Sequence, residues 1–173
     1  MASQIMSKVF TYSGKMLDLS DIRPEAIDIK DIAHALSQLC RFSGQCRSFY
    51  SVAEHSIRVC GLVPDEHKLA ALLHDASEAY LGDVIAPIKQ MLPAYKKLED
   101  ELMAVIANKF GFQWPLPAVV KEADRKMLDQ ELDTVFSTPL INGMQISPHM
   151  IKLEFLSIYY KLKKTHEQQE KNA

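Results

Sequence analysis

The sequence predicts an all-α protein that folds as a single domain. Apolar residues recur at helical spacing through most of the chain, which is typical of amphipathic helices. Glycine and proline separate these segments, and strands do not alternate with helices. The length of 173 residues suits one domain. A content of 47% hydrophobic and 24% charged residues is that of an ordinary globular chain, and it argues against membrane, collagen-like, disordered and disulfide-rich classes.

We expect three parts along the chain. Residues 1–27 form an N-terminal arm, in which β-branched and aromatic residues around Gly14 predict a small hairpin or an extended strand over 9–20. Residues 28–165 form a helical bundle. The polar residues 166–173 form a tail that frays.

The first half of the bundle contains three predicted helices. Regularly spaced isoleucine and leucine residues predict the first helix over 29–40. Ser51 and Glu54 have the spacing of a capping box, which predicts the start of the second helix. Asp65 is expected to cap a third helix, which runs toward His74.

The second half of the bundle is predicted to hold three longer helices. Gly82 and Pro87 interrupt the helical pattern before them. The first long helix follows Pro93, the next covers residues 118–137, and the last begins after Pro148.

Composition also limits the partners of the chain. The 20 basic and 22 acidic side chains give a net charge of -2, which argues against an electrostatic grip on long nucleic acid. No apolar run approaches the roughly 18 residues of a membrane span, and the start of the chain lacks a secretory signal. Three cysteines, Cys40, Cys46 and Cys60, have no metal-binding spacing and are typical of reduced thiols. We therefore expect a cytoplasmic protein that binds neither long nucleic acid nor membrane.

Two histidines and two aspartates stand on apolar faces of predicted helices. His55 lies on the inner stripe of its helix, and His74 and Asp75 follow a run of leucines. Asp124 lies between apolar residues of a later helix. Burial of such groups is costly without compensation, and a divalent cation would provide it. Imidazole nitrogens together with carboxylate oxygens suit Mn, Fe, Co, Ni or Zn.

Each of these four residues also has an ordinary structural interpretation. A His-Asp dipeptide occurs by chance, a buried histidine is more often hydrogen-bonded than metal-bound, and Asp124 alone could form a salt bridge. Their joint position on inward faces favours a site. The other histidines are expected to be surface or structural residues: His34, His67, His149 and His166.

Four short motifs give the chain a resemblance to a known family. They are EHS at 54–56, HDASEAYLGD at 74–83, PIK at 87–89 and EAD at 122–124. Over residues 38–135 the sequence resembles the HD-domain metal-dependent phosphohydrolases, most closely the small branch of bacterial 5′-deoxyribonucleotidases and phage-encoded deoxynucleoside triphosphohydrolases. The resemblance implies an HD-type helical bundle and a catalytic divalent cation (Co, Mn, Zn or Fe, with Mg as a further candidate). The implied ligands are His55, His74, Asp75 and Asp124.

The same resemblance assigns roles to five further residues. Glu78 is the implied acid–base group, and Asp83 is implied to contact the deoxyribose 3′-hydroxyl. Lys89 and Arg41 are implied to bind phosphate, while Phe42, where many relatives have tryptophan, packs on the sugar. Without the resemblance, Glu78 reads as a helix-end acid, Asp83 as a turn residue, Lys89 as a surface lysine and Phe42 as core.

The implied reaction is hydrolysis at the α-phosphorus of a deoxyribonucleotide, with cleavage of the bond to the 5′-oxygen. The interval between His55 and His74 is shorter than in the bacterial nucleotidases. This favours a triphosphohydrolase, with dATP as substrate, that releases deoxynucleoside and triphosphate. The alternatives are a 5′-deoxyribonucleotidase acting on monophosphates and a regulatory module that binds metal and nucleotide without turnover, against which Glu78 argues. Relatives assemble, so a homo-oligomer (dimer or hexamer) is expected.

Overall fold

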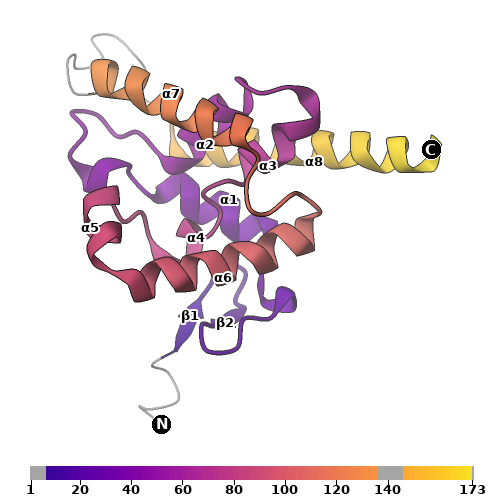
Figure 1. The fold of residues 1–173 in the computed structure, drawn as a ribbon, viewed down its shortest axis with the longest axis horizontal. Helices are drawn as coiled ribbons and strands as arrows, with labels where there is room; N and C mark the ends of the chain where they lie inside the picture. The colour runs from indigo at the N-terminus through magenta and orange to yellow at the C-terminus, as the bar shows by residue number, and fades with distance from the viewer. Residues whose placement is uncertain (1–6, 136–145, 173) are drawn as a thin grey trace.

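Helices make up 65% of the computed structural model, which describes residues 7–135 and 146–172. Within these residues there are eight α-helices and one small two-stranded sheet (Figure 1). The prediction of an all-α, single-domain fold is confirmed. No helix in the described ranges is both long enough and apolar enough to cross a membrane.

The N-terminal arm is a hairpin that packs on the helical bundle. Strand β1 (Lys8–Phe10) pairs antiparallel with β2 (Met16–Asp18), and the middle residues of the two strands lie opposite each other. The Leu17 side chain is fully buried. In the turn, the backbone N–H and the hydroxyl of Ser13 donate to the buried Asp31 carboxylate at 2.6 and 2.8 Å. These contacts attach the hairpin to the first helix.

Helix α1 (Ile29–Gln38) lies in the middle of the fold, where it packs against α2, α4 and α8. The Asp28 carboxylate caps its first turn, and Ile32 and Leu36 are fully buried. The helix ends two residues before the predicted boundary, because Leu39 adopts an extended conformation and its carbonyl accepts from the backbone of the next helix.

Helix α2 (Val52–Cys60) begins as its capping pattern predicts. The Ser51 hydroxyl accepts a hydrogen bond from the Glu54 N–H at 3.1 Å. The Glu54 side chain itself pairs with Arg58 at 2.6 Å. The cap fixes the start of the helix that carries His55.

We expect Ser51→Ala to destabilise the protein by about 1 kcal/mol, since it removes a side-chain cap from a helix N-terminus. Urea unfolding of both proteins measures this difference. Ser51 is fully buried, and an unchanged unfolding midpoint would show that its hydroxyl contributes nothing to the start of α2.

The third predicted helix is divided in the structure. Residues Asp65–His67 form a 3-10 turn, and α3 (Lys68–Leu72) follows. The prediction that Asp65 caps this helix is wrong: its carboxylate instead pairs with the Lys68 ammonium at 2.6 Å. An i,i+3 ion pair takes the place of the cap.

Two short helices that were not predicted follow the His-Asp pair. They are α4 (Glu78–Leu81) and α5 (Ala86–Met91). Gly82, with φ of 82°, ends α4 as a residue without a Cβ can. Pro87 does not interrupt a helix but lies in the first turn of α5, where a missing N–H costs nothing.

The remaining helices follow the predicted order. Helix α6 (Pro93–Phe110) ends at Gly111 in the left-handed conformation. Helix α7 (Ala118–Val135) begins at the predicted position, and its predicted end at residue 137 lies outside the described residues. Helix α8 (Pro148–Asn172) is the longest of the described helices, and residues 166–172 of the predicted tail are its final part, while residue 173 lies outside the described residues. The tail contains no glycine or proline that would end the helix.

Candidate metal centre

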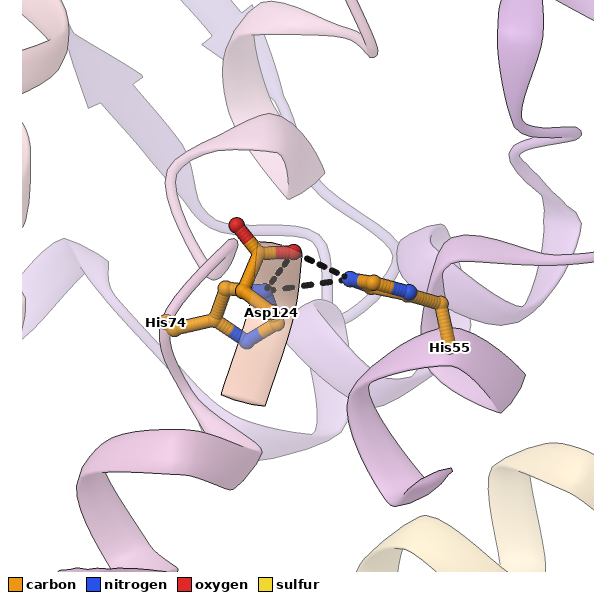
Figure 2. A group of neighbouring side chains, drawn as sticks. All are labelled: His55, His74 and Asp124. Carbon is orange, nitrogen blue, oxygen red and sulfur yellow. Dashed lines mark hydrogen bonds and ion pairs between the residues drawn. The ribbon is translucent and has the colours of Figure 1, made fainter. Parts of the chain in front are cut away.

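Three side chains from separate segments of the chain meet at one point (Figure 2). His55 comes from α2, His74 follows α3, and Asp124 comes from α7. The His55 and His74 Nε2 atoms are 3.2 Å apart, and the Asp124 Oδ1 atom is 3.1 Å from the first and 3.7 Å from the second. This group could hold a metal ion, because its ligand atoms all lie within 4.8 Å of one another.

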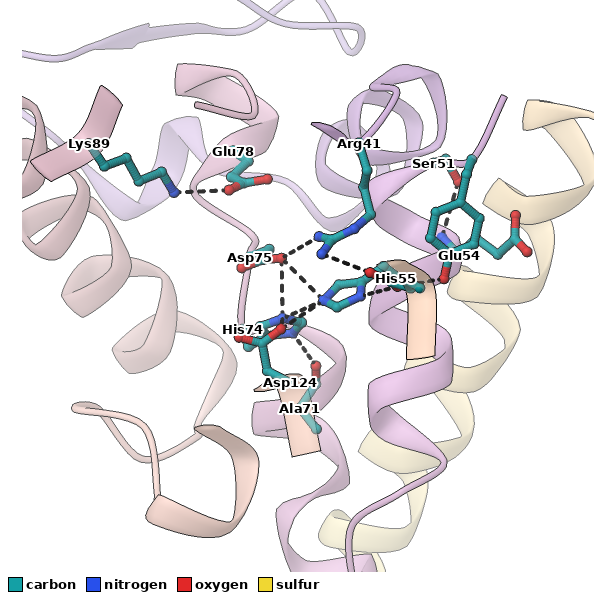
Figure 3. A network of polar contacts seen from close by, with 12 residues as sticks. Arg41, Ser51, Glu54, His55, Ala71, His74, Asp75, Glu78, Lys89 and Asp124 are labelled. Atoms are coloured by element: carbon teal, nitrogen blue, oxygen red, sulfur yellow. Dashed lines mark hydrogen bonds and ion pairs between the residues drawn. The ribbon is translucent and has the colours of Figure 1, made fainter. Parts of the chain in front are cut away.

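Asp75 adds a second carboxylate to this group. Its Oδ2 atom is 3.2 Å from the His74 Nε2 atom and 3.8 Å from that of His55. The structure therefore brings together all four residues that were expected to be ligands. On its other side the same oxygen is 3.7 Å from the Arg41 guanidinium (Figure 3).

Hydrogen bonds on the far side of each imidazole fix which nitrogen faces the centre. The His55 Nδ1 atom is 2.6 Å from the Glu131 carboxylate, and the His74 Nδ1 atom is 2.8 Å from the Ala71 carbonyl. Both partners accept only, so each Nδ1 carries a hydrogen and donates it. In the neutral ring, each Nε2 then presents its lone pair to the centre, which is the arrangement that a metal ligand needs.

Lone pairs and carboxylate oxygens therefore face one another in a buried place. Three carboxylates (Asp75, Asp124 and Glu131) and one guanidinium (Arg41) give 1 − 3 = −2 with neutral histidines. Such a group requires a compensating positive charge. A divalent cation satisfies all four acceptors at once, whereas a proton on one imidazole satisfies only some of them.

The spacing of the donor atoms fits such a cation. Imidazole nitrogens and carboxylate oxygens bind first-row divalent metals at about 2.0–2.2 Å, which places neighbouring ligands about 3.0–3.6 Å apart. The three shortest separations in the group are 3.1, 3.2 and 3.2 Å. The Asp124 side chain is 44% exposed, so one side of the centre is open to solvent.

Charge effects on the pKa values agree with this arrangement. Burial raises the pKa of Asp124, but hydrogen bonds from His55 and His74 outweigh it and the pKa is lowered. For His74, burial lowers the pKa, but Asp75 and Asp124 outweigh it and the pKa is raised well above the ordinary value. In the metal-free site His74 thus holds a proton that a metal ion must displace.

Metal affinity is therefore expected to fall on acidification. Displacement of one proton predicts an affinity that changes about tenfold per pH unit below the raised pKa of His74. Titration of the protein with Co²⁺ between pH 6 and pH 8, followed by absorption, measures this slope. A pH-independent affinity would contradict displacement of a proton from His74.

A second buried group of charges lies beside the centre (Figure 3). Glu78 on α4 is 5% exposed, and its Oε1 atom accepts from the Lys89 ammonium at 3.1 Å. The same ammonium donates to Glu99 on α6 at 2.6 Å. Burial, with the nearby Asp75 carboxylate, raises the pKa of Glu78 to about 9. A glutamate that keeps its proton at neutral pH can serve as a proton donor.

The loop between α1 and α2 carries two more of the residues expected to bind substrate. The Arg41 side chain is 11% exposed, and its guanidinium carbon is 5.2 Å from the centre of the Phe42 ring. Phe42 and Ser43 have φ values of 55° and 53°, which are strained for residues with a Cβ. Hydrogen bonds between the two ends of the loop, such as Arg41 N–H to the Tyr50 carbonyl at 2.9 Å, hold it in place.

Asp83 lies in the segment between α4 and α5. Its carboxyl is half-buried, and no hydrogen bond or ion pair of its side chain occurs among the described residues. The pKa of Asp83 is raised: burial and the Asp75 carboxylate raise it, and the Arg41 guanidinium lowers it by less. Arg41, Asp75 and Asp83 thus lie near one another beside the centre.

Three residues of these networks were not predicted from the sequence. They are Tyr50, Glu99 and Glu131, all buried. One signal was available for Glu131, since it lies seven residues after Asp124 and so on the same face of the helix. Nothing in the local sequence marks Tyr50 or Glu99.

A cleft of about 530 Å³ opens beside the centre. His74, Asp75 and Asp124 lie at one end of it. Lys89, Lys96 and Lys121 also line the cleft, together with an apolar wall of Met103, Trp114, Pro115 and Leu116. The centre is therefore connected to a space large enough for a small organic molecule.

Comparison with known proteins places the chain among bacterial relatives. No protein-family model matches the sequence. It is 42% identical over 144 residues to the uncharacterized protein YfdR of Escherichia coli (strain K12), an alignment that covers 80% of this chain and 81% of YfdR. The chain belongs to the YfdR family. It is also 44% identical over 121 residues to an uncharacterized protein of Rhodobacter capsulatus, over 64% of this chain and 62% of that protein. Membership of the YfdR family carries no activity with it, so function rests on the site.

Proposed function

We propose that this YfdR-family protein is an HD-domain phosphohydrolase that depends on a divalent metal and cleaves deoxyribonucleotides between the 5′-oxygen and the α-phosphorus. One observation carries the proposal. Two buried imidazoles and two aspartates direct nitrogen and carboxylate oxygen atoms at one point, beside a cleft lined by lysines. The four motifs that resemble the HD-domain enzymes supply these same residues.

Each group around the point has a chemical task in this proposal. A cation held by His55, His74, Asp75 and Asp124 would supply positive charge to a phosphate oxygen and acidify water. Arg41 offers a planar guanidinium that binds two phosphate oxygens, which offsets charge as the phosphorus is attacked. Water adds to the α-phosphorus, the bond to the 5′-oxygen breaks, and that oxygen takes up a proton.

Glu78 is the donor of that proton in our proposal. Its raised pKa of about 9 keeps it protonated at neutral pH, and Lys89 holds its carboxyl in place at 3.1 Å. After the leaving oxygen has been protonated, the glutamate recovers its proton from the water that has added to phosphorus.

We favour a triphosphate as substrate, with dATP first among candidates because of the resemblance to the phage enzymes. The cleft beside the centre has a volume of about 530 Å³, and lysines line it. Lys121 lies one helical turn before Asp124 and forms no ion pair with any described residue, so its charge is available to a phosphate chain. The products are then deoxynucleoside and intact triphosphate.

The alternative is a 5′-deoxyribonucleotidase that releases phosphate from monophosphates. One observation favours it: Lys89 and Lys96 are already paired with acidic residues, namely Glu78, Glu99 and Asp100. A metal-bearing module that binds nucleotide without turnover is a further candidate, but it would have no use for a buried glutamate with a raised pKa.

A substrate panel decides among these functions. The purified protein is incubated with dNMPs, dNTPs and rNTPs, each with Mn²⁺, Co²⁺, Zn²⁺ or Mg²⁺, and the products are resolved by chromatography. We expect deoxynucleoside and triphosphate from dATP. Phosphate from dNMPs alone would establish the nucleotidase, and binding without products would establish the regulatory module. Release of pyrophosphate would contradict attack at the position that we propose.

Lys121→Ala is expected to raise KM for dATP about 10–150-fold and to leave KM for dAMP nearly unchanged, because an ammonium–phosphate contact contributes about 1.5–3 kcal/mol. Steady-state kinetics with both substrates measure the difference. Lys126→Ala is the matched control, since Lys126 is an exposed lysine on the same helix. Equal effects of the two substitutions would remove Lys121 from the phosphate site.

The same proposal extends to assembly and location. We expect a cytoplasmic homo-oligomer, either a dimer or a hexamer. Its ligand is expected to be a deoxynucleotide rather than a long nucleic acid. Light scattering on the purified protein measures the oligomer, and a monomer at all concentrations would reject it.

A further inference from the structure

Glu131 is a buried carboxylate at the base of the metal centre, with 1% of its surface exposed. It is held from three directions. Its Oε1 atom accepts from the His55 ring at 2.6 Å and from the Tyr50 hydroxyl at 2.7 Å. Its Oε2 atom is 3.0 Å from the Arg41 guanidinium. A single carboxylate thus contacts both an expected metal ligand and the expected phosphate-binding arginine.

The contact with His55 determines what that ring offers to the centre. A carboxylate can only accept, so His55 donates its Nδ1–H, and in the neutral ring Nε2 keeps a lone pair. Without this acceptor the ring is free to place its hydrogen on Nε2, and it then has no lone pair for a metal ion.

The contact with Arg41 determines the direction of the guanidinium. Arg41 is 11% exposed, and its other terminal nitrogen lies 3.7 Å from the Asp75 carboxylate. It comes directly before Phe42 and Ser43, whose φ values of 55° and 53° mark a strained backbone. Contacts with Glu131 and Asp75 thus hold the guanidinium between two carboxylates.

We propose that Glu131 is a positioning residue that holds His55 as a metal ligand through one oxygen and Arg41 as an anion contact through the other. It thereby couples the cation site to the anion contact. The effect on the cation follows from the geometry alone. The effect on phosphate rests on the proposed function.

The test compares Glu131→Gln with Tyr50→Phe by titration of the metal-free proteins with Co²⁺, followed by visible absorption. The glutamine has the same shape but carries no charge. Its amide N–H₂ group is a donor, so it cannot accept a hydrogen bond from Arg41. We expect Co²⁺ affinity to fall about 10–100-fold, with an altered Co²⁺ spectrum, as is usual when the acceptor behind a ligating histidine is weakened. Tyr50→Phe removes another buried hydrogen bond to the same carboxylate but leaves His55 in place, and its affinity is expected to stay close to that of the wild type.

Two results would overturn the proposal. One is an unchanged Co²⁺ affinity and spectrum in a folded Glu131→Gln. The other is an equal loss in both variants, which would indicate general damage to packing. Nitrogen-15 NMR of the wild-type imidazoles tests the same point without a substitution: the neutral His55 ring must carry its hydrogen on Nδ1, and a neutral ring with its hydrogen on Nε2 would refute the role.

Kinetics separate this inference from the proposed function. If the wild type hydrolyses deoxynucleotides, Glu131→Gln is expected to raise KM even when metal is saturating, because Arg41 has lost its anchor. If the wild type hydrolyses none of them while Glu131→Gln still weakens Co²⁺ binding, only the proposed function fails. Unchanged KM at saturating metal would limit Glu131 to the cation.

Discussion

Replacement of Asp124 by alanine is expected to remove the bound cation and all measurable hydrolysis. Its Oδ1 atom lies 3.1 and 3.7 Å from the two imidazole Nε2 atoms, so the substitution removes one of the four expected ligands. Substitution of a residue that only orients a metal ligand lowers metal affinity about 10–100-fold. Loss of a ligand itself is therefore expected to lower metal affinity more than about 100-fold. Metal analysis of the purified variant and turnover at saturating dATP measure both effects.

The matched control for this variant is Asp129→Ala, which removes an exposed aspartate from the same helix. It should keep metal and turnover. Circular dichroism shows whether each variant is folded. Full metal occupancy in a folded Asp124→Ala would remove Asp124 from the ligand set, and the Asp75→Ala variant tests the fourth ligand in the same way.

Glu78→Ala is expected to keep the cation and to lose turnover. The side chain is assigned to proton transfer, and loss of a positioned acid–base group lowers kcat by about 10²–10⁴-fold. The loss should appear in kcat rather than in KM, because the interaction acts in the transition state. Metal content and steady-state kinetics of the variant, measured together, separate this role from that of a ligand.

The pH dependence gives a second test of Glu78. Proton donation needs the protonated carboxyl, whose pKa is raised to about 9, so wild-type kcat should fall as pH rises through that value. Glu78→Gln should lack this descending limb. The control is Glu101→Ala, an exposed glutamate on α6 that should leave kcat unchanged. A near-normal kcat in Glu78→Ala would assign proton transfer to another residue.

The main helices could be predicted because their signals are local. The spacing of Val120, Ala123 and Met127 placed the buried face of α7, and the structure buries all three. Ser51 marked the start of α2, and Gly111 marked the end of α6. These features depend on a few neighbouring residues, which a sequence displays directly.

The division of the third helix and the short helices α4 and α5 could not be predicted in the same way. Their lengths are five, four and six residues, which is too short for an apolar period to be visible. A proline such as Pro87 can either interrupt a helix or lie in the first turn of one. The local sequence does not distinguish the two, and in the structure Pro87 lies in the first turn of α5.

The four residues of the metal centre could be predicted because apolar neighbours enclose them and familiar motifs contain them. Their partners could not. Glu131 meets His55 and Tyr50 only when α7 packs beside α2, and Glu99 meets Lys89 only across α5 and α6. Long-range contacts of polar side chains leave no period in the sequence, so the network that orients the ligands is visible only in the fold.

The most direct test of this account is anomalous diffraction from crystals of the protein grown with Mn²⁺ or Co²⁺. We predict a single strong peak within about 2.0–2.3 Å of the His55 Nε2, His74 Nε2 and Asp124 Oδ1 atoms, with Asp75 at a similar distance. The peak should be absent from crystals of Asp124→Ala. A wild-type crystal with no peak between these atoms, or with its metal bound elsewhere, would contradict the account.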